Sequence, residues 1–215
     1  LLSACVTAQS APTQADDWSE VRTGHFRVRA QLDAAGTGAI AESLEDLRAG
    51  VAAYWGIDPK DRLEVVVYRD AAALNEFGGA SFVHPGSNGT TLVTAAALAQ
   101  SPAFARLAAH ELAHLLGAHF MPRQPRWLSE GLAQYLETLD LAVAPGKATY
   151  GKPPEGLRPN DLIAQPVTFA QLWGWTTDDT LPIAQSGWAW WVVHFLADAH
   201  GERFEHTVKP CPGDE

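Results

Sequence analysis

The sequence predicts an α+β fold, in which a small mixed α/β lobe (residues 18–97) is followed by a mainly helical lobe (residues 98–208). Stretches of alternating or β-branched residues are concentrated before residue 97, whereas apolar residues at helical spacing dominate from residue 101 onward. A chain of 215 residues with 47% hydrophobic content can also bury one substantial core. We therefore expect one domain with two lobes.

The first lobe is expected to alternate strands and helices. Residues 25–30 alternate polar and apolar side chains, and residues 63–68 are rich in valine, so both stretches are predicted strands. Between them, apolar residues at helical spacing predict a helix over residues 36–54. Two shorter elements are expected to follow: a short helix over residues 70–77, closed by Gly78 and Gly79, and a strand over residues 90–94 after the turn Ser87-Asn88-Gly89.

The second lobe is expected to consist of helices joined by loops. Ser101 and Pro102 are typical of a helix start, and this helix is predicted to extend to Gly117. A second helix is predicted after Pro125, with an apolar stripe from Leu128 to Leu139. Residues 141–166 are expected to form loops with at most one short strand. Two further helices are expected over residues 168–173 and 186–199. The tryptophans of the last helix are interpreted as packing in the core or between the lobes.

Charge argues against nucleic acid as a partner, and hydropathy argues against a transmembrane helix. The formal net charge is −10 and no cluster of Lys or Arg occurs, so the chain lacks the cationic surface that binds nucleic acid. No run of 18 apolar residues occurs, so we expect no transmembrane helix in this sequence.

The two ends of the sequence differ in composition from the predicted domain. Residues 2–5, Leu-Ser-Ala-Cys, resemble the lipobox of bacterial lipoproteins, in which the cysteine is lipidated. This resemblance implies a lipid anchor on Cys5, a flexible tether over residues 1–17 and a place in the bacterial cell envelope, on the periplasmic or extracellular face. An acylated Cys5 could not pair with Cys211, so no disulfide is expected. Residues 209–215 are interpreted as a C-terminal linker or tail.

The sequence His110-Glu111-Leu112-Ala113-His114 is an HExxH motif on a predicted helix. Four helical residues rotate by about 400°, so the two imidazoles lie about 40° apart and one turn from each other, where both can bind one ion. Glu111 is offset by about 100°, which suits action on a bound water rather than binding to the metal. The motif therefore predicts one Zn²⁺ ion.

A catalytic zinc ion needs a third protein ligand, and two candidates follow the motif. The longer pattern HExxHxxGxxH would require a histidine at position 120, but His119 comes one residue too early. Glu130 lies on the second predicted helix between Leu128 and Leu132, where a carboxylate beside an apolar stripe needs a partner. Gly131 would allow a close approach of helices there. We expect Glu130 to be the third ligand; the alternative is a solvated helix glutamate.

HELAH (residues 110–114) followed by WLSEGLAQYLE (residues 127–137) resembles the gluzincin metallopeptidases, most closely the peptidase MA-like bacterial families. The resemblance extends over about residues 18–200, with the two motifs specific. It implies a zincin-like fold with the HExxH helix between the lobes, and Glu130 as the third zinc ligand. It also implies that Glu111 activates a zinc-bound water toward a peptide bond, and that the strand near residues 90–93 is the edge strand that pairs with the substrate.

The chain departs from the gluzincin pattern in the residue that stabilises the oxyanion. Such enzymes use a Tyr or His from the C-terminal region, but no Tyr follows Tyr150 here. Tyr150 and His194 are possible substitutes. The main hypothesis is thus a zinc peptidase acting on a peptide or protein substrate. The alternatives are a zinc-containing module that binds an envelope partner without catalysis, and a hydrolase of a non-peptide amide.

Overall fold

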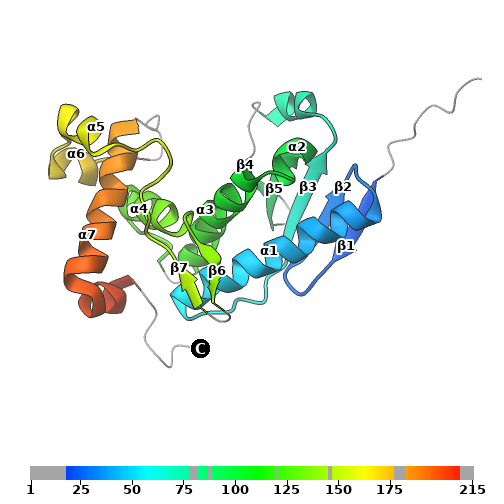
Figure 1. The fold of residues 1–215 in the computed structure, drawn as a ribbon, viewed down its shortest axis with the longest axis horizontal. Helices are drawn as coiled ribbons and strands as arrows, with labels where there is room; N and C mark the ends of the chain where they lie inside the picture. Colours follow the sequence, from blue (N-terminus) through cyan, green and yellow to red (C-terminus); the bar gives the residue numbers. More distant parts are fainter. Residues whose placement is uncertain are drawn as a thin grey trace, which may run out of the picture.

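The computed structural model describes residues 18–77, 82–86, 89–119, 121–144, 147–176 and 183–208. These residues form a mixed α+β structure with a sheet in the N-terminal part and mainly helices in the C-terminal part, as the sequence predicted (Figure 1). The predicted lipobox and tether, the tail over residues 209–215 and the helix-closing Gly78 and Gly79 lie outside the described residues.

A five-stranded sheet has the order β1-β2-β3-β5-β4. Strands β2 (Phe26–Ala30), β3 (Leu63–Tyr68) and β5 (Gly89–Ala95) are parallel to one another, and β1 (Ser19–Arg22) and β4 (Phe82–Gly86) run antiparallel at the two edges. The expectation that the strand near residues 90–93 is an edge strand is wrong, because β5 is hydrogen-bonded on both sides. The edge position next to it belongs to β4, which the sequence analysis did not predict.

Helix α1 (Ala34–Trp55) connects β2 to β3 and packs on β1, β2 and helix α3. It begins where the Asp33 carboxylate accepts a hydrogen bond from the Gly36 N–H at 2.7 Å, and it ends at Gly56, whose φ of 69° is in the left-handed region. Its buried face contributes Leu44, Val51 and Trp55 to the main core. The predicted helix started two residues later, because the Asp33 cap was not recognised.

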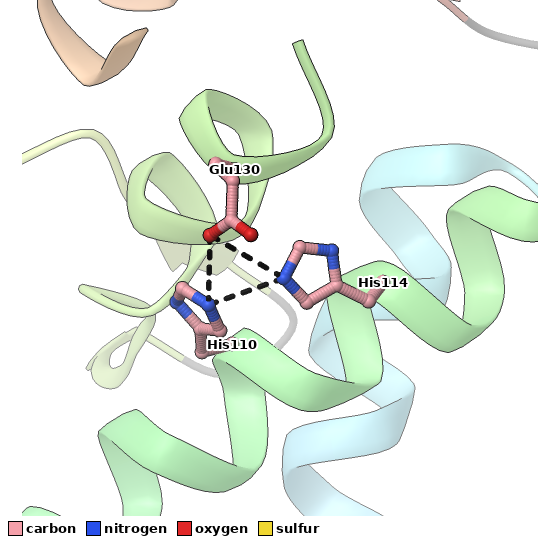
Figure 2. A group of neighbouring side chains, drawn as sticks. All are labelled: His110, His114 and Glu130. Carbon is pink, nitrogen blue, oxygen red and sulfur yellow. Dashed lines mark hydrogen bonds and ion pairs between the residues drawn. The ribbon is translucent and has the colours of Figure 1, made fainter. Parts of the chain in front are cut away.

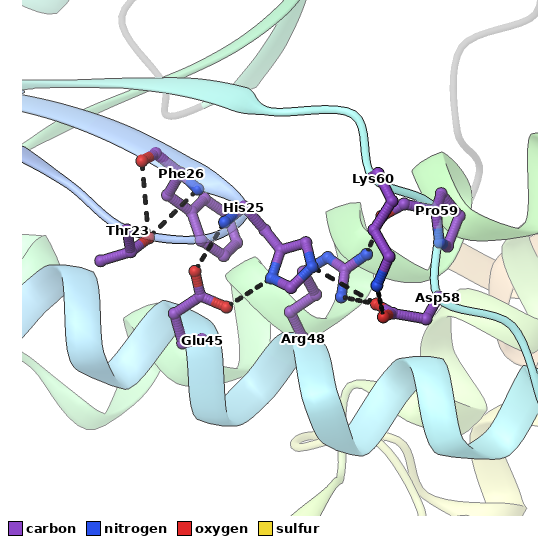
Figure 3. A network of polar contacts seen from close by, with 8 residues as sticks. All are labelled: Thr23, His25, Phe26, Glu45, Arg48, Asp58, Pro59 and Lys60. Atoms are coloured by element: carbon purple, nitrogen blue, oxygen red, sulfur yellow. Dashed lines mark hydrogen bonds and ion pairs between the residues drawn. The ribbon is translucent and has the colours of Figure 1, made fainter.

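A polar network ties the C-terminal half of α1 to the segments around it (Figure 3). The backbone N–H of His25 donates to Glu45 on α1 at 2.8 Å, and the His25 ring lies between Glu45 (2.8 Å) and Asp58 (3.3 Å). Arg48, which is buried, donates to Asp58 at 2.8 Å and also to the Pro59 carbonyl. The network fixes the turn before β2 and the loop before β3 to one helix.

A 3₁₀ helix, η1 (Ala71–Phe77), and a short helix, α2 (Ala96–Ala99), precede α3 (Pro102–Ala118). The helix α3 starts where Ser101 and Pro102 predicted, but the Ser101 hydroxyl donates to the Leu98 carbonyl instead of capping the helix. Through Phe104, Ala108 and Leu112, α3 contributes to the same core as α1.

The helical part is built around α4 (Arg126–Leu136) and α7 (Ile183–Val208). A Cβ atom at Gly131 would lie 2.5 Å from the Ala189 carbonyl oxygen and 2.7 Å from Val193, so only glycine permits this helix contact. The close approach of helices expected at Gly131 is therefore confirmed. Helix α7 is longer than the predicted 186–199, with non-helical dihedrals at His200.

The prediction of loops with at most one strand over residues 141–166 is wrong. Strands β6 (Asp140–Ala144) and β7 (Lys147–Thr149) form a hairpin, and α5 (Pro159–Ala164) precedes α6 (Phe169–Trp173), whose capping box is formed by Thr168 and Gln171. These short elements carry little periodicity of their own. They form against larger ones, because β6 packs on α1 and α5 packs on α7.

Helix α3 lies between the sheet with α1 on one side and α4 with α7 on the other (Figure 1). Among the described helices, none is sufficiently long and apolar to span a membrane.

Candidate metal centre

Helices α3 and α4 bring His110, His114 and Glu130 together (Figure 2). The Nε2 atoms of the two histidines are 3.2 Å apart, and Oε2 of Glu130 lies 3.7 Å from His110 Nε2 and 3.8 Å from His114 Nε2. The two histidines are one turn apart on α3, as the HExxH spacing predicted. The three residues form a group that could hold a metal ion.

The geometry of this group fits zinc. In a tetrahedral zinc site with metal–ligand distances of about 2.0–2.2 Å, neighbouring ligand atoms are roughly 3.3–3.6 Å apart. The observed separations of 3.2, 3.7 and 3.8 Å lie close to that range. Two imidazoles and one carboxylate also form one of the common ligand sets of catalytic zinc.

The other ring nitrogen of each histidine is hydrogen-bonded from α4 or just beyond it. His110 Nδ1 is 2.9 Å from Oε2 of Glu137, and His114 Nδ1 is 2.9 Å from Oγ of Ser129. When Nδ1 carries the proton and donates it to these partners, Nε2 keeps its lone pair for a metal. Sequence reasoning missed both partners. Glu137 could have been found, because it follows Glu130 by two helical turns and therefore shares its face.

The second oxygen of Glu130 has Arg126 as its neighbour. Its Oε1 is 3.8 Å from Arg126, one turn earlier on α4, and the Arg126 guanidinium stacks on Trp175 at 4.7 Å. Burial opposes ionisation of Glu130, but the hydrogen bond and charges of the histidines, with Arg126, hold its pKa below the usual value. Glu130 is therefore a carboxylate at neutral pH, which a metal ligand must be.

The pKa values of the two histidines are shifted in opposite directions. Burial lowers the pKa of His110, but hydrogen bonds to Glu130 and Glu137 outweigh it and raise this pKa to about 9. Burial and then the charge of His110 lower the pKa of His114 to about 4. In the absence of a metal, His110 is therefore charged and His114 neutral at neutral pH, so the pair carries one positive charge.

Glu111 lies on the side of α3 that faces the sheet. It lines a gap of about 10 Å³ together with Leu63, Val65 and Leu92, which is close to the volume that one water molecule needs. Burial raises the pKa of Glu111, and the charge of Glu130 raises it further, whereas His110 acts in the opposite direction. Glu111 is thus electrostatically coupled to two members of the metal group, while its side chain is offset from them.

Neither proposed oxyanion donor joins the metal group in the described part of the chain. The Tyr150 ring contacts Tyr54 at 5.1 Å and Tyr135 at 5.5 Å, and the His194 ring lies 6.1 Å from Tyr135 and stacks on Trp190 at 4.9 Å. Both residues belong to an aromatic cluster between α1, α4 and α7. Their roles as oxyanion donors therefore stay predictions.

His119, the other candidate for the third ligand, lies apart from the group. It ends α3 and is 3.7 Å from Asp61, with both side chains exposed. This placement agrees with the choice of Glu130. Comparison with models of known protein families and with curated protein sequences finds no match to this chain.

Proposed function

We propose that this chain is a zinc-dependent hydrolase of peptide bonds with a zincin-like fold, anchored in the bacterial cell envelope through Cys5. The observation that carries the proposal is the convergence of His110, His114 and Glu130, beside the offset carboxylate of Glu111. The resemblance of the HELAH and WLSEGLAQYLE sequences to gluzincins supports the peptide bond as the substrate.

The ligand residues suit a zinc ion, which when bound polarises a carbonyl group and acidifies a water molecule. Glu111 would take the proton of the attacking water and deliver it to the leaving amine. Its partly buried position raises its pKa, which favours a group that both accepts and donates a proton near neutral pH. Glu137 and Ser129 would keep the two imidazoles oriented throughout.

The second candidate function is a zinc-containing module that binds an envelope partner without catalysis. It is favoured by the position of Tyr150 and His194 in the aromatic cluster, because an oxyanion donor must reach the reacting carbonyl. The two functions make different demands on Glu111, which only the hydrolase needs as a base.

Cleavage of a mixed peptide library by the wild type and by Glu111→Gln, with the zinc content of both proteins, tests the proposal. We expect the wild type to cleave, and Glu111→Gln to retain zinc but lose activity by at least about 100-fold, the scale of general base catalysis. Stoichiometric zinc without cleavage by the wild type would instead support the binding module.

A further inference from the structure

A cavity of about 420 Å³ lies between α5 and α7, outside the metal group. This volume falls within the range of about 300–1,000 Å³ that is typical of small-molecule binding sites. The walls are mainly aromatic and aliphatic, and they include Leu162 and Ile163 from α5 and Trp188, Trp190, Trp191 and His194 from α7.

Two of the lining rings carry buried polar atoms that lack a partner. Trp190 is only 5% exposed, and its indole N–H finds no acceptor among the described residues. The Nδ1 atom of His194 is also buried and has no hydrogen-bond partner among the described residues, and the Trp190 and His194 rings are stacked with their centroids 4.9 Å apart. Both nitrogens are covered by the protein itself, so they do not face the open cavity, and the walls that a ligand would meet are mainly apolar.

One wall of the cavity is fixed to the helix that carries the metal ligands. Pro153 and Leu157 line the cavity, and Glu155 between them forms an ion pair with Arg106. Arg106 precedes His110 by one turn of α3, which corresponds to about 6 Å along the helix axis.

The composition of the walls favours an aromatic side chain over a sugar. Rings of Trp188, Trp190 and Trp191 could stack on either ligand. A sugar, however, brings many hydroxyl groups, and each hydroxyl that is buried without a partner is costly. With the ring nitrogens of Trp190 and His194 covered, the walls offer few polar partners, which suits the largely apolar ring of an aromatic side chain.

We propose that this cavity binds an aromatic side chain of the substrate that is cleaved at the metal centre, because its wall is joined through Glu155 and Arg106 to the helix that carries His110. This inference rests on the proposed function and adds the substrate preference to it. The cavity would therefore select peptides that contain Phe, Tyr or Trp.

Binding is tested with the intact protein by following its indole N–H signals in NMR spectra, with Trp190→Phe used to assign the Trp190 signal. The probes are N-acetylphenylalaninamide, N-acetylalaninamide and N-acetylglucosamine. We expect only the first to shift the Trp190 signal in a saturable way. A saturable shift caused by the sugar, or no shift with the phenylalanine probe, would overturn the inference.

A matched pair of variants connects the cavity to catalysis. Ile163 lines the cavity and is 75% exposed, whereas Phe169 is 64% exposed and lies on α6 outside it. We expect Ile163→Glu to weaken binding of the phenylalanine probe, and to lower kcat/KM for peptides with aromatic residues, by at least about tenfold. Phe169→Glu introduces the same charge and should change neither value.

The outcomes separate this inference from the proposed function. If peptides are cleaved without a preference for aromatic residues and Ile163→Glu has no effect, the inference is wrong and the peptidase stands. If the phenylalanine probe binds to the cavity but no peptide is cleaved, the peptidase is wrong, while the aromatic ligand class stands.

Discussion

Glu137 holds His110 in place, and its removal should weaken metal binding by an amount that follows from the structure. Oε2 of Glu137 lies 2.9 Å from Nδ1 of His110, and both side chains are only 19% exposed. A hydrogen bond to a charged group contributes about 1.5–3 kcal/mol. Since about 1.4 kcal/mol is a factor of ten, Glu137→Ala should reduce zinc affinity by about 10–100-fold. Glu137→Gln keeps an acceptor and should cost less than Glu137→Ala.

Ser129→Ala is the matched variant, because the Ser129 hydroxyl is a neutral partner of His114 at the same distance of 2.9 Å. A neutral hydrogen bond contributes about 0.5–1.5 kcal/mol, so we expect a loss of only about 2–10-fold. The assay is competition for zinc with a chromogenic chelator, with circular dichroism to show that each variant is folded. Wild-type affinity in Glu137→Ala, or a larger loss in Ser129→Ala than in Glu137→Ala, would refute the orienting role.

Three further predictions concern packing and protonation. Gly131→Ala places a methyl group against the Ala189 carbonyl and should destabilise the protein by about 1–3 kcal/mol, as measured by urea unfolding; unchanged stability would contradict the close helix contact. Zinc binding at pH 7 should release about one proton, because the pKa of His110 is about 9 without metal and that of His114 about 4. Calorimetry in buffers of different ionisation enthalpy measures the number of protons released. Zero release would contradict the assignment of a charged His110 as a zinc ligand. The unfolded-state pKa of a histidine is about 6.5, so the metal-free protein should lose stability as the pH rises from 6.5 to 9 because of His110, and as the pH falls from 6.5 to 4 because of His114. Urea unfolding in the presence of a chelator at several pH values checks that the stability is highest near pH 6.5. The loss of stability above pH 6.5 should be absent in His110→Asn.

Much of the site could be predicted because its spacing is local. His110 and His114 share a face of α3 through helical periodicity alone, and the approach of the two Nε2 atoms to 3.2 Å follows from it. For Glu130 to reach the histidines, the second helix must fold back on the first. The position of its carboxylate beside an apolar stripe was a sufficient signal to predict Glu130 as a ligand. The strands β2 and β3 were predicted within a residue, because alternation and β-branching are strong there.

What could not be predicted depends on contacts between distant segments. The antiparallel edge strand β4 and the hairpin of β6 and β7 are short and obtain their stability from pairing partners, so their own sequences carry little signal. Helical spacing places Glu137 on the same face as Glu130, but its contact with His110 depends on the position of α4 against α3, which no periodicity within one helix specifies. The same holds for Tyr150 and His194, which tertiary packing draws into the aromatic cluster.

The zinc content of the purified protein tests the central claim most directly. Mass spectrometry of the wild type, Glu130→Gln and Glu155→Gln separates the proposed ligand from a surface glutamate, whose side chain is 73% exposed. We expect one zinc ion per chain in the wild type and in Glu155→Gln, and a marked loss of zinc in Glu130→Gln. Wild-type protein without zinc, or full zinc occupancy in Glu130→Gln, would contradict it.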